Sequence, residues 1–381
     1  LRDMGVVIEG PHQGQVRVFG VGLNGLQPPP GPLYLGHSAT AMRLLAGVLA
    51  AQPFDTELFG DEALCRRDMT RVAEPLRQMG ALIETGEAGG APLRIKGGQS
   101  LCGIDYRLPV PSAQVKSSLL LAGLWAKGDT CIRESLATRD HTERMLAALG
   151  ANICCSTGSV RLKPGATLHA TGITVPGDIS WATLFMLVAG SGHNRGEYRL
   201  QSVGINPSRM GALQVLQQMG ADIRLEQMRE QLGEPVADLL VAAGPKLKGI
   251  QADASLLAAA VDELPLLLVA AAVAEGESRF SGLAGLRHKE DDPVQKTVVM
   301  LAERGVSVTQ DEDSIRITGG GLQGGSIEAR GSLRLAMAAV AAGLCCAETL
   351  TVNQSGALLA AYPDFVEQAQ RAGLNVHKEE D

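Results

Sequence analysis

One short phrase recurs six times along the chain and constrains the fold more than any other feature. In each copy, apolar residues at helical spacing lead to a glycine, and alternating apolar and polar residues follow it. Glycine adopts the left-handed conformation that closes a helix more readily than other residues do. Each phrase therefore predicts a helix that ends at glycine and continues directly into a strand. The six glycines are Gly5, Gly80, Gly150, Gly220, Gly305 and Gly373.

The spacing of these glycines, about 70–85 residues, is typical of a protein built from repeated α/β units. Because only four residues precede Gly5, we expect about 60–70 residues of the first unit to be missing. The sequence also lacks an initiating Met, which suggests a fragment, a truncated product or part of a longer or fused chain.

The length of 381 residues predicts two domains, since a single core rarely grows beyond about 250–300 residues. The repeat pattern restarts in the segment 175–190, and we place the boundary there, with domains at 1–181 and 182–381. The first domain should hold the incomplete unit and two full ones, and the second should hold three. Hydrophobic residues make up 45% of the chain but aromatic residues only 3%, so Leu, Ala and Val should fill the cores.

Composition excludes several classes of function. A net charge of −7 argues against a general nucleic-acid or membrane surface, although it leaves room for a local basic pocket. The longest apolar stretch, 264–274, is too short to span a bilayer. None of the seven cysteines forms a CxxC pair, so we expect buried, reduced thiols, a cytoplasmic location and no metal site.

Polar and cationic residues recur where loops lead into the predicted helices. Helix starts expose free backbone N–H groups and bind anions well. In a repeat architecture, equivalent positions in each unit lie on one face, so these residues are candidates for a shared site. Considered alone, the loop-to-helix start in 33–50 is better explained as a simple capped helix. The residues concerned include Ser38, Arg43, Ser112, Gln114, Arg139, Asp262, Glu263 and Arg334.

Five phrases in a fixed order carry a family resemblance: SAQVKSSLLLAG, RDHTERML, PGDIS, VDELP and HKE. Together they resemble the 5-enolpyruvylshikimate-3-phosphate (EPSP) synthases, which join phosphoenolpyruvate to shikimate 3-phosphate. The resemblance implies the α/β enolpyruvyl transferase fold, with up to six βαβαββ-type units, the first incomplete, helices inside and sheets outside. It also implies a ligand cleft between two domains, these two substrates as partners, and neither a cofactor nor a metal.

The resemblance assigns catalytic roles to three residues. Asp262 matches the acidic residue that holds the ring hydroxyls and serves as a base, and Lys289 and Glu290 match a pair implicated in proton transfer. A purely structural alternative, a helix cap for Asp262 and a surface ion pair for the other two, stays open.

Six further residues match substrate ligands of the family. Ser112 and Gln114 match the shikimate-phosphate loop, and Gln114 also faces the enolpyruvyl group. Arg139 matches another contact on the phosphate side. Arg67 and Arg334 match arginines that clamp phosphoenolpyruvate, and Arg43 matches the arginine of the GNSGTxMR loop.

Several positions depart from the family pattern, mainly on the phosphoenolpyruvate side. Asp68 stands beside Arg67, with which it could pair, and a clamping arginine is replaced by Pro293. Since the loss of one such ligand costs about 10²–10³ in rate, these changes predict little or no standard activity. The alternative is an active carboxyvinyltransferase, on the usual or an altered acceptor, with the missing N-terminal segment supplied. Further departures are His37, Ala39, Trp181, Asp291, Ser332, Leu333, Leu359 and Ala360.

Overall fold

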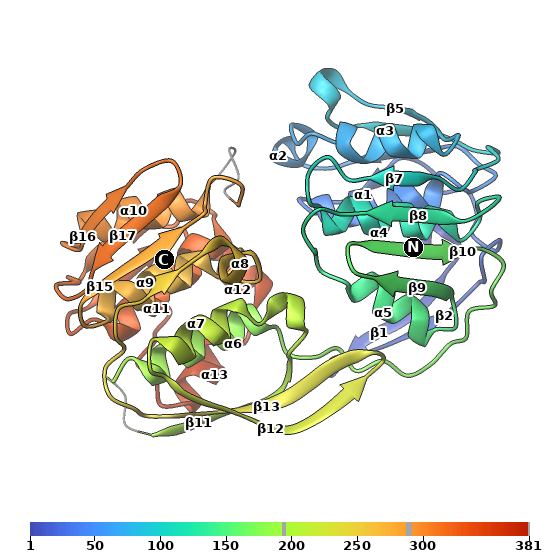
Figure 1. The fold of residues 1–381 in the computed structure, drawn as a ribbon. Coiled ribbons are helices and arrows are strands. Elements are labelled where there is room, and N and C mark those ends of the chain that lie inside the picture. Colours follow the sequence, from blue (N-terminus) through green and yellow to red (C-terminus); the bar gives the residue numbers. More distant parts are fainter. Residues whose placement is uncertain (193–195, 287–291, 380–381) are drawn as a thin grey trace. The chain divides into compact units, whose positions relative to one another are not determined.

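In the computed structural model, which describes residues 1–192, 196–286 and 292–379, the chain forms two compact units (Figure 1). The first unit spans Leu1–Ile173 and the second Thr174–Asp381. The predicted boundary at 181–182 would cut the helix Ile179–Gly190, which lies wholly in the second unit. A helix packs as one body, so the division falls in the extended segment before it.

The first unit contains a two-stranded sheet, two four-stranded sheets and the helices that pack on them. In chain order its elements are η1 (Arg2–Met4), β1 (Val7–His12), β2 (Gln15–Phe19), β3 (Leu33–Tyr34), α1 (Ala39–Leu49), β4 (Thr56–Phe59), α2 (Glu62–Cys65), α3 (Thr70–Gln78), β5 (Leu82–Glu84), η2 (Glu87–Gly89), β6 (Leu93–Lys96), β7 (Asp105–Arg107), α4 (Ala113–Gly123), β8 (Thr130–Arg133), α5 (His141–Ala148), β9 (Asn152–Ser156) and β10 (Ser159–Lys163).

The second unit contains a three-stranded, a four-stranded and a two-stranded sheet among its described residues. Its elements are α6 (Ile179–Gly190), β11 (Glu197–Gly204), η3 (Pro207–Arg209), α7 (Gly211–Gln218), β12 (Asp222–Gln231), β13 (Glu234–Ala242), β14 (Gln251–Ala252), α8 (Ala254–Ala258), α9 (Leu264–Val273), β15 (Glu277–Ser281), α10 (Pro293–Glu303), β16 (Ser307–Gln310), β17 (Ser314–Thr318), β18 (Gly325–Glu328), α11 (Leu333–Cys345), β19 (Leu350–Asn353), α12 (Gly356–Ala361) and α13 (Phe365–Arg371).

The three four-stranded sheets share one topology. Their strand orders are β3-β4-β6-β5, β7-β8-β10-β9 and β14-β15-β17-β16. In each sheet the first pair is parallel and the other two pairs are antiparallel. A helix follows each of the first two strands, which confirms the predicted βαβαββ-type unit of the enolpyruvyl transferase fold.

The glycine phrases also appear as predicted. All six glycines have positive φ values, from +79° at Gly373 to +102° at Gly80. Strands follow five of them, but 374–378 after Gly373 is not a strand, because no neighbouring strand among the described residues pairs with it. The phrase before Gly5 is also shorter than a full α-helix and forms the 3₁₀ turn η1.

Helices fill the interior of each unit, and the sheets cover them. In α9 every residue from 264 to 272 is buried, which explains why this helix is apolar all round rather than amphipathic. Strand β6 alternates, with Leu93 and Ile95 buried and Arg94 and Lys96 facing solvent. Burial of such Leu, Ile, Val and Met side chains contributes about 1.5–3 kcal/mol each.

Close packing of α1 against α4 depends on a glycine. A Cβ on Gly47 would come within 2.1 Å of the Ser118 carbonyl oxygen, which belongs to the backbone and has little freedom to move. We therefore expect Gly47→Ala to lower the free energy of unfolding by about 1–3 kcal/mol, measured by urea denaturation. Gly356→Ala, in α12, is the matched control, because its Cβ meets no atom within 4 Å. Equal stabilities of the two variants would contradict this packing argument.

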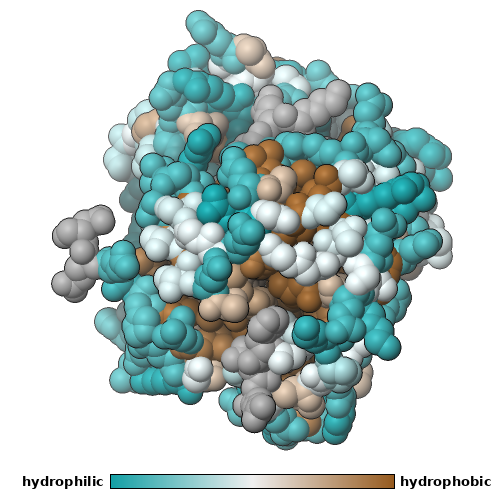
Figure 2. Space-filling view, turned by 90° about the vertical axis from the view of Figure 1, so that its left-hand side faces the viewer, coloured by the Kyte–Doolittle hydropathy of each residue, from teal (hydrophilic) through white to brown (hydrophobic). Residues whose placement is uncertain are grey.

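The structure also bears on the predictions about membrane-spanning helices and about cysteine burial. Polar residues surround smaller apolar patches on the face shown in Figure 2. Among the described helices, none combines the length and the apolar run needed to cross a bilayer. The expectation that all cysteines are buried is wrong for Cys102, Cys154 and Cys155, which are exposed, because they lie outside the helical core or on the edge strand β9.

Candidate functional site

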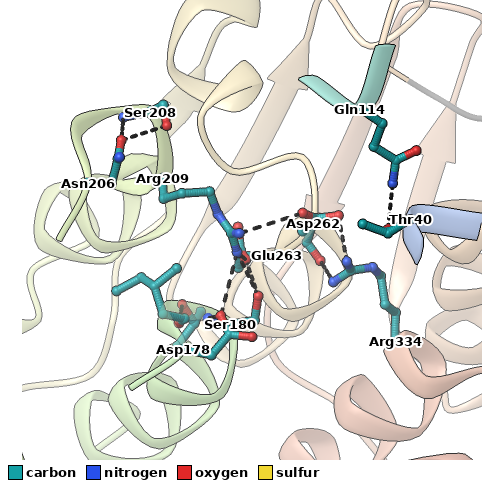
Figure 3. A network of polar contacts seen from close by, with 12 residues as sticks. Thr40, Gln114, Asp178, Ser180, Asn206, Ser208, Arg209, Asp262, Glu263 and Arg334 are labelled. Atoms are coloured by element: carbon teal, nitrogen blue, oxygen red, sulfur yellow. Dashed lines mark hydrogen bonds and ion pairs between the residues drawn. The ribbon is translucent and has the colours of Figure 1, made fainter. Parts of the chain in front are cut away.

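In the second unit, polar side chains from several helix starts converge (Figure 3). Asp178 caps α6 by accepting from the Ser180 N–H at 2.9 Å. Arg209 ends η3 just before α7, and Asp262 lies just before α9. Arg334 belongs to the first turn of α11. These residues are far apart in sequence, and the repeat brings them to the same end of the unit.

Asp262 and Arg334 form the most direct pair in this cluster. Arg334 Nη2 donates to Asp262 Oδ1 over 2.5 Å, and Nη1 donates to the Asp262 carbonyl oxygen over 2.8 Å. Burial lowers the pKa of Arg334, and the nearby charge of Arg209 lowers it further although Glu263 opposes the effect. The alternative in which Asp262 caps α9 is wrong, because the N-cap residue of α9 is Glu263. The Glu263 side chain makes no capping hydrogen bond either.

Arg209 is a residue of this cluster that sequence analysis missed. Its Nη2 donates to Glu263 Oε1 at 2.7 Å and to Ser180 Oγ at 2.9 Å. The same guanidinium lies 3.7 Å from Asp178 and 4.0 Å from Asp262. The sequence offered one signal for Arg209: the segment INPSRMG places it at a helix start equivalent to those of the predicted site residues.

In the first unit, Arg43 joins two neighbouring helix starts. Its Nη1 donates to Gln114 Oε1, and its Nη2 donates to the Asp68 carbonyl oxygen at 3.1 Å. Gln114 in turn donates through Nε2 to Thr40 Oγ1 at 2.7 Å (Figure 3). The structure thus brings Arg43 and Gln114 together, as a shared ligand site requires.

Positive charge gathers around Arg43. Burial lowers the pKa of Arg43, and the charges of Arg67 and Arg71 lower it further. An anion bound here would relieve this repulsion, and guanidinium groups bind phosphate and carboxylate with two parallel hydrogen bonds. The group has the charge and geometry to hold a small anionic ligand.

Asp68 does not pair with Arg67, contrary to the possibility raised by the sequence. Its Oδ1 accepts from the Thr70 N–H at 2.8 Å, and its Oδ2 lies 3.6 Å from Arg71 Nε. No ion pair among the described residues joins it to Arg67, which is exposed. The aspartate therefore supports the start of α3 and leaves the Arg67 guanidinium available.

The other predicted residues of the first unit also lie at helix starts. Ser112 is the N-cap of α4 and accepts from the Val115 N–H at 3.3 Å. Arg139 is half-buried just before α5. Behind them lies an ion cluster in which Lys116 Nζ contacts Glu143 Oε1 at 2.7 Å and Glu134 Oε1 at 3.0 Å. The cluster connects α4 with α5 and the loop before it.

Three departures from the family pattern have local structural explanations. The Trp181 ring packs on Tyr362 at a centroid distance of 4.9 Å and on Phe365 at 5.7 Å. Pro293 occupies the start of α10, where its lack of an N–H costs nothing. Ala39 is 6% exposed, so its methyl group is packed within the core of the first unit.

Lys289 and Glu290, two of the three predicted catalytic residues, lie outside the described residues, as does Asp291. In the ranges 1–192, 196–286 and 292–379, no group of three or more His, Cys, Asp or Glu side chains could hold a metal ion. The described helix starts carry arginines and an amide in the first unit and arginines and carboxylates in the second, groups suited to binding polyanions and exchanging protons.

Comparisons with known proteins agree with this chemistry. The family model of EPSP synthase (3-phosphoshikimate 1-carboxyvinyltransferase) matches residues 1–369. A 3-phosphoshikimate 1-carboxyvinyltransferase of Methylococcus capsulatus is 48% identical over 375 residues, which are 98% of this chain and 85% of that protein. One from Alkalilimnicola ehrlichii is also 48% identical, over 98% of this chain and 83% of its own length.

Solved structures give the same result. The EPSP synthase of Acinetobacter baumannii superposes with a TM-score of 0.91 at 45% identity, covering 100% of this chain and 87% of that one. The enolpyruvyl transferase NikO of Streptomyces tendae shares the fold, with a TM-score of 0.72 at 15% identity, covering 99% of this chain and 85% of that one. These matches give no support to the predicted degenerate site. The chain belongs to the EPSP synthase family, whose reaction is that of a 3-phosphoshikimate 1-carboxyvinyltransferase.

Proposed function

We propose that this chain catalyses carboxyvinyl transfer from phosphoenolpyruvate to shikimate 3-phosphate. The observation that carries the proposal is 48% identity, over 98% of the chain, to a protein named as a 3-phosphoshikimate 1-carboxyvinyltransferase. The side chains at the helix starts support it, because each unit supplies arginines next to groups that accept or donate hydrogen bonds. The active alternative is thus favoured over the prediction of little or no activity.

The first unit supplies ligands for the anionic groups of the substrates. Arg43 and Arg67 bind the phosphate and carboxylate of phosphoenolpyruvate, and Ser112, Gln114 and Arg139 bind the shikimate 3-phosphate side. Holding both reactants in register converts their encounter into an effectively unimolecular step. Because Arg43 is half-buried and the charges of Arg67 and Arg71 act on it, a bound anion would interact with these charges more strongly than it would in bulk water.

The second unit supplies the groups that move protons. Asp262 holds the ring hydroxyls and accepts the proton of the 5-hydroxyl as its oxygen attacks C2 of phosphoenolpyruvate. Lys289 and Glu290 deliver a proton to C3 and later remove one, so that phosphate leaves and the enol double bond is restored. Arg334 binds the phosphoenolpyruvate anion. An acid and a base that exchange roles satisfy both halves of this addition and elimination.

A second candidate function is substrate binding with little turnover. The observation that favours it is the carboxylate of Asp68, whose charge acts on Arg43 within the proposed anion site and opposes binding of a further negative charge. Shikimate 3-phosphate would then bind through Ser112, Gln114 and Arg139, and phosphoenolpyruvate would bind weakly.

Phosphate release from the purified chain tests the proposal. We expect release only when shikimate 3-phosphate and phosphoenolpyruvate are both present, at a rate within the range of about 1–10³ s⁻¹ usual for enzymes. The control is each substrate alone. Absence of release from a chain that melts cooperatively would overturn the proposal. In that case, calorimetric binding of shikimate 3-phosphate would leave the second candidate standing, and binding of neither substrate would reject both.

A further inference from the structure

A buried contact in the second unit has no role in the reaction described so far. Arg209 Nη2 donates to Glu263 Oε1 at 2.7 Å and to Ser180 Oγ at 2.9 Å, and Ser180 also donates to the same carboxylate oxygen (Figure 3). The Glu263 side chain is fully buried, and that of Arg209 is 17% exposed. Three elements, α6, η3 and the residue before α9, are thereby joined at one point.

The guanidinium of Arg209 also faces the proposed base. Its Nη1 lies 4.0 Å from Asp262 Oδ2, whereas Arg334 Nη2 contacts the other oxygen, Oδ1, at 2.5 Å. Each carboxylate oxygen of Asp262 therefore faces a different arginine. The two arginines differ in how they are held, because Arg334 is 34% exposed while Arg209 is anchored by Glu263 and Ser180.

The two arginines can therefore have different tasks, one in binding substrate and the other in orienting Asp262. Arg334 is the proposed ligand of phosphoenolpyruvate, so substrate binding draws its guanidinium towards the new anion and weakens its hold on Asp262. Arg209 stays in place, since its contacts with Glu263 and Ser180 do not involve the substrate. We propose that Arg209 is a positioning residue that keeps Asp262 oriented for proton transfer while Arg334 binds phosphoenolpyruvate, with Glu263 and Ser180 fixing Arg209. The inference rests on the proposed function of Asp262.

Stability alone is a poor explanation for the contact. A buried ion pair often contributes no more than well-packed apolar residues of the same volume. Glu263 Oε2 is moreover buried without a hydrogen-bond partner among the described residues, which is a cost to the fold. Features that cost stability are retained where function needs them. Here the need is a fixed positive charge beside Asp262.

A crystal structure of Arg209→Met in the full chain tests the inference without relying on turnover. We expect the Asp262 carboxylate to rotate away from its position in the unsubstituted chain, with both oxygens drawn towards Arg334. If Asp262 keeps the same position in both structures, the inference is overturned. Because this readout needs no substrate, it is separate from any failure of the proposed function.

Kinetics of phosphate release give the second test. Arg209→Met should lower kcat about 10²-fold, the effect of a misplacement of about 1 Å, with KM for phosphoenolpyruvate unchanged. Arg209→Lys keeps a positive charge near Glu263 and should restore part of the loss. The control is Arg199→Met, which removes a 41%-exposed arginine of β11 that lies 3.7 Å from Asp238 of β13, and it should leave kcat unchanged. A less stable Arg209→Met chain with unchanged kcat would show a purely structural role and reject the inference.

Discussion

Asp262→Asn is expected to lower the rate of phosphate release from shikimate 3-phosphate and phosphoenolpyruvate by about 10²–10⁴-fold, the usual contribution of a positioned general base. The amide keeps the size of the side chain but accepts no proton. It also removes the negative charge that Arg334 contacts at 2.5 Å, so the guanidinium keeps its bond to the Asp262 backbone carbonyl oxygen but loses its anionic partner. We therefore expect kcat to fall while the chain still folds, as measured by steady-state kinetics and thermal melting.

The matched control for this substitution is Asp222→Asn. Asp222 belongs to the same unit and also pairs with an arginine, Arg224, at 2.6 Å, but it lies at the exposed surface of β12. Its substitution should leave kcat unchanged. If Asp262→Asn were to keep the parent kcat with both substrates, Asp262 would be neither the base nor a ligand of the ring hydroxyls, and the assignment would fail.

Lys116→Met is expected to lower the free energy of unfolding by about 3–5 kcal/mol, as removal of one partner of a buried ion pair typically does. Lys116 is 1% exposed and lies between Glu134 and Glu143, whose side chains are 11% and 4% exposed. Methionine has a similar length but no charge, so two buried carboxylates would face each other without a cation. Urea denaturation followed by circular dichroism measures the loss.

The stability loss of Lys116→Met should depend on pH, whereas a loss caused only by a cavity would not. Burial raises the pKa of Glu143, although contact with Lys116 opposes the shift. A raised pKa means that the folded state binds the proton more tightly than the unfolded state does. Glu143 therefore favours folding most below its unfolded pKa, and this contribution is lost as the pH rises through the folded value. In Lys116→Met the loss of stability should consequently be smaller at acidic than at neutral pH.

An exposed pair of the same chemistry is the control for Lys116. Lys96 contacts Asp55 at 2.6 Å, but the two side chains are 62% and 61% exposed. Because water screens such pairs, Lys96→Met should leave stability unchanged within error. If both lysine variants were equally stable, burial would not be the source of the effect.

The sequence by itself determined the repeated units and the positions at which their helices end. Glycine is the residue that tolerates positive φ, so Gly80, Gly150 and Gly220 mark helix ends whatever surrounds them. Alternation along β6 and the apolar length of α9 likewise followed from local periodicity. The equivalent helix starts, and with them Asp262, Arg334 and Gln114 as candidates, were predictable because repeats place equivalent positions on one face.

Only the tertiary structure decided which charges meet. Asp68 lies next to Arg67 in sequence but pairs with Arg71, because Asp68 turns to support the start of α3. Arg209 and Glu263 are 54 positions apart, and nothing local indicates that they form a buried pair. Local preferences fix helices, strands and turns, whereas the choice of ion-pair partner depends on distance and burial after the elements have packed.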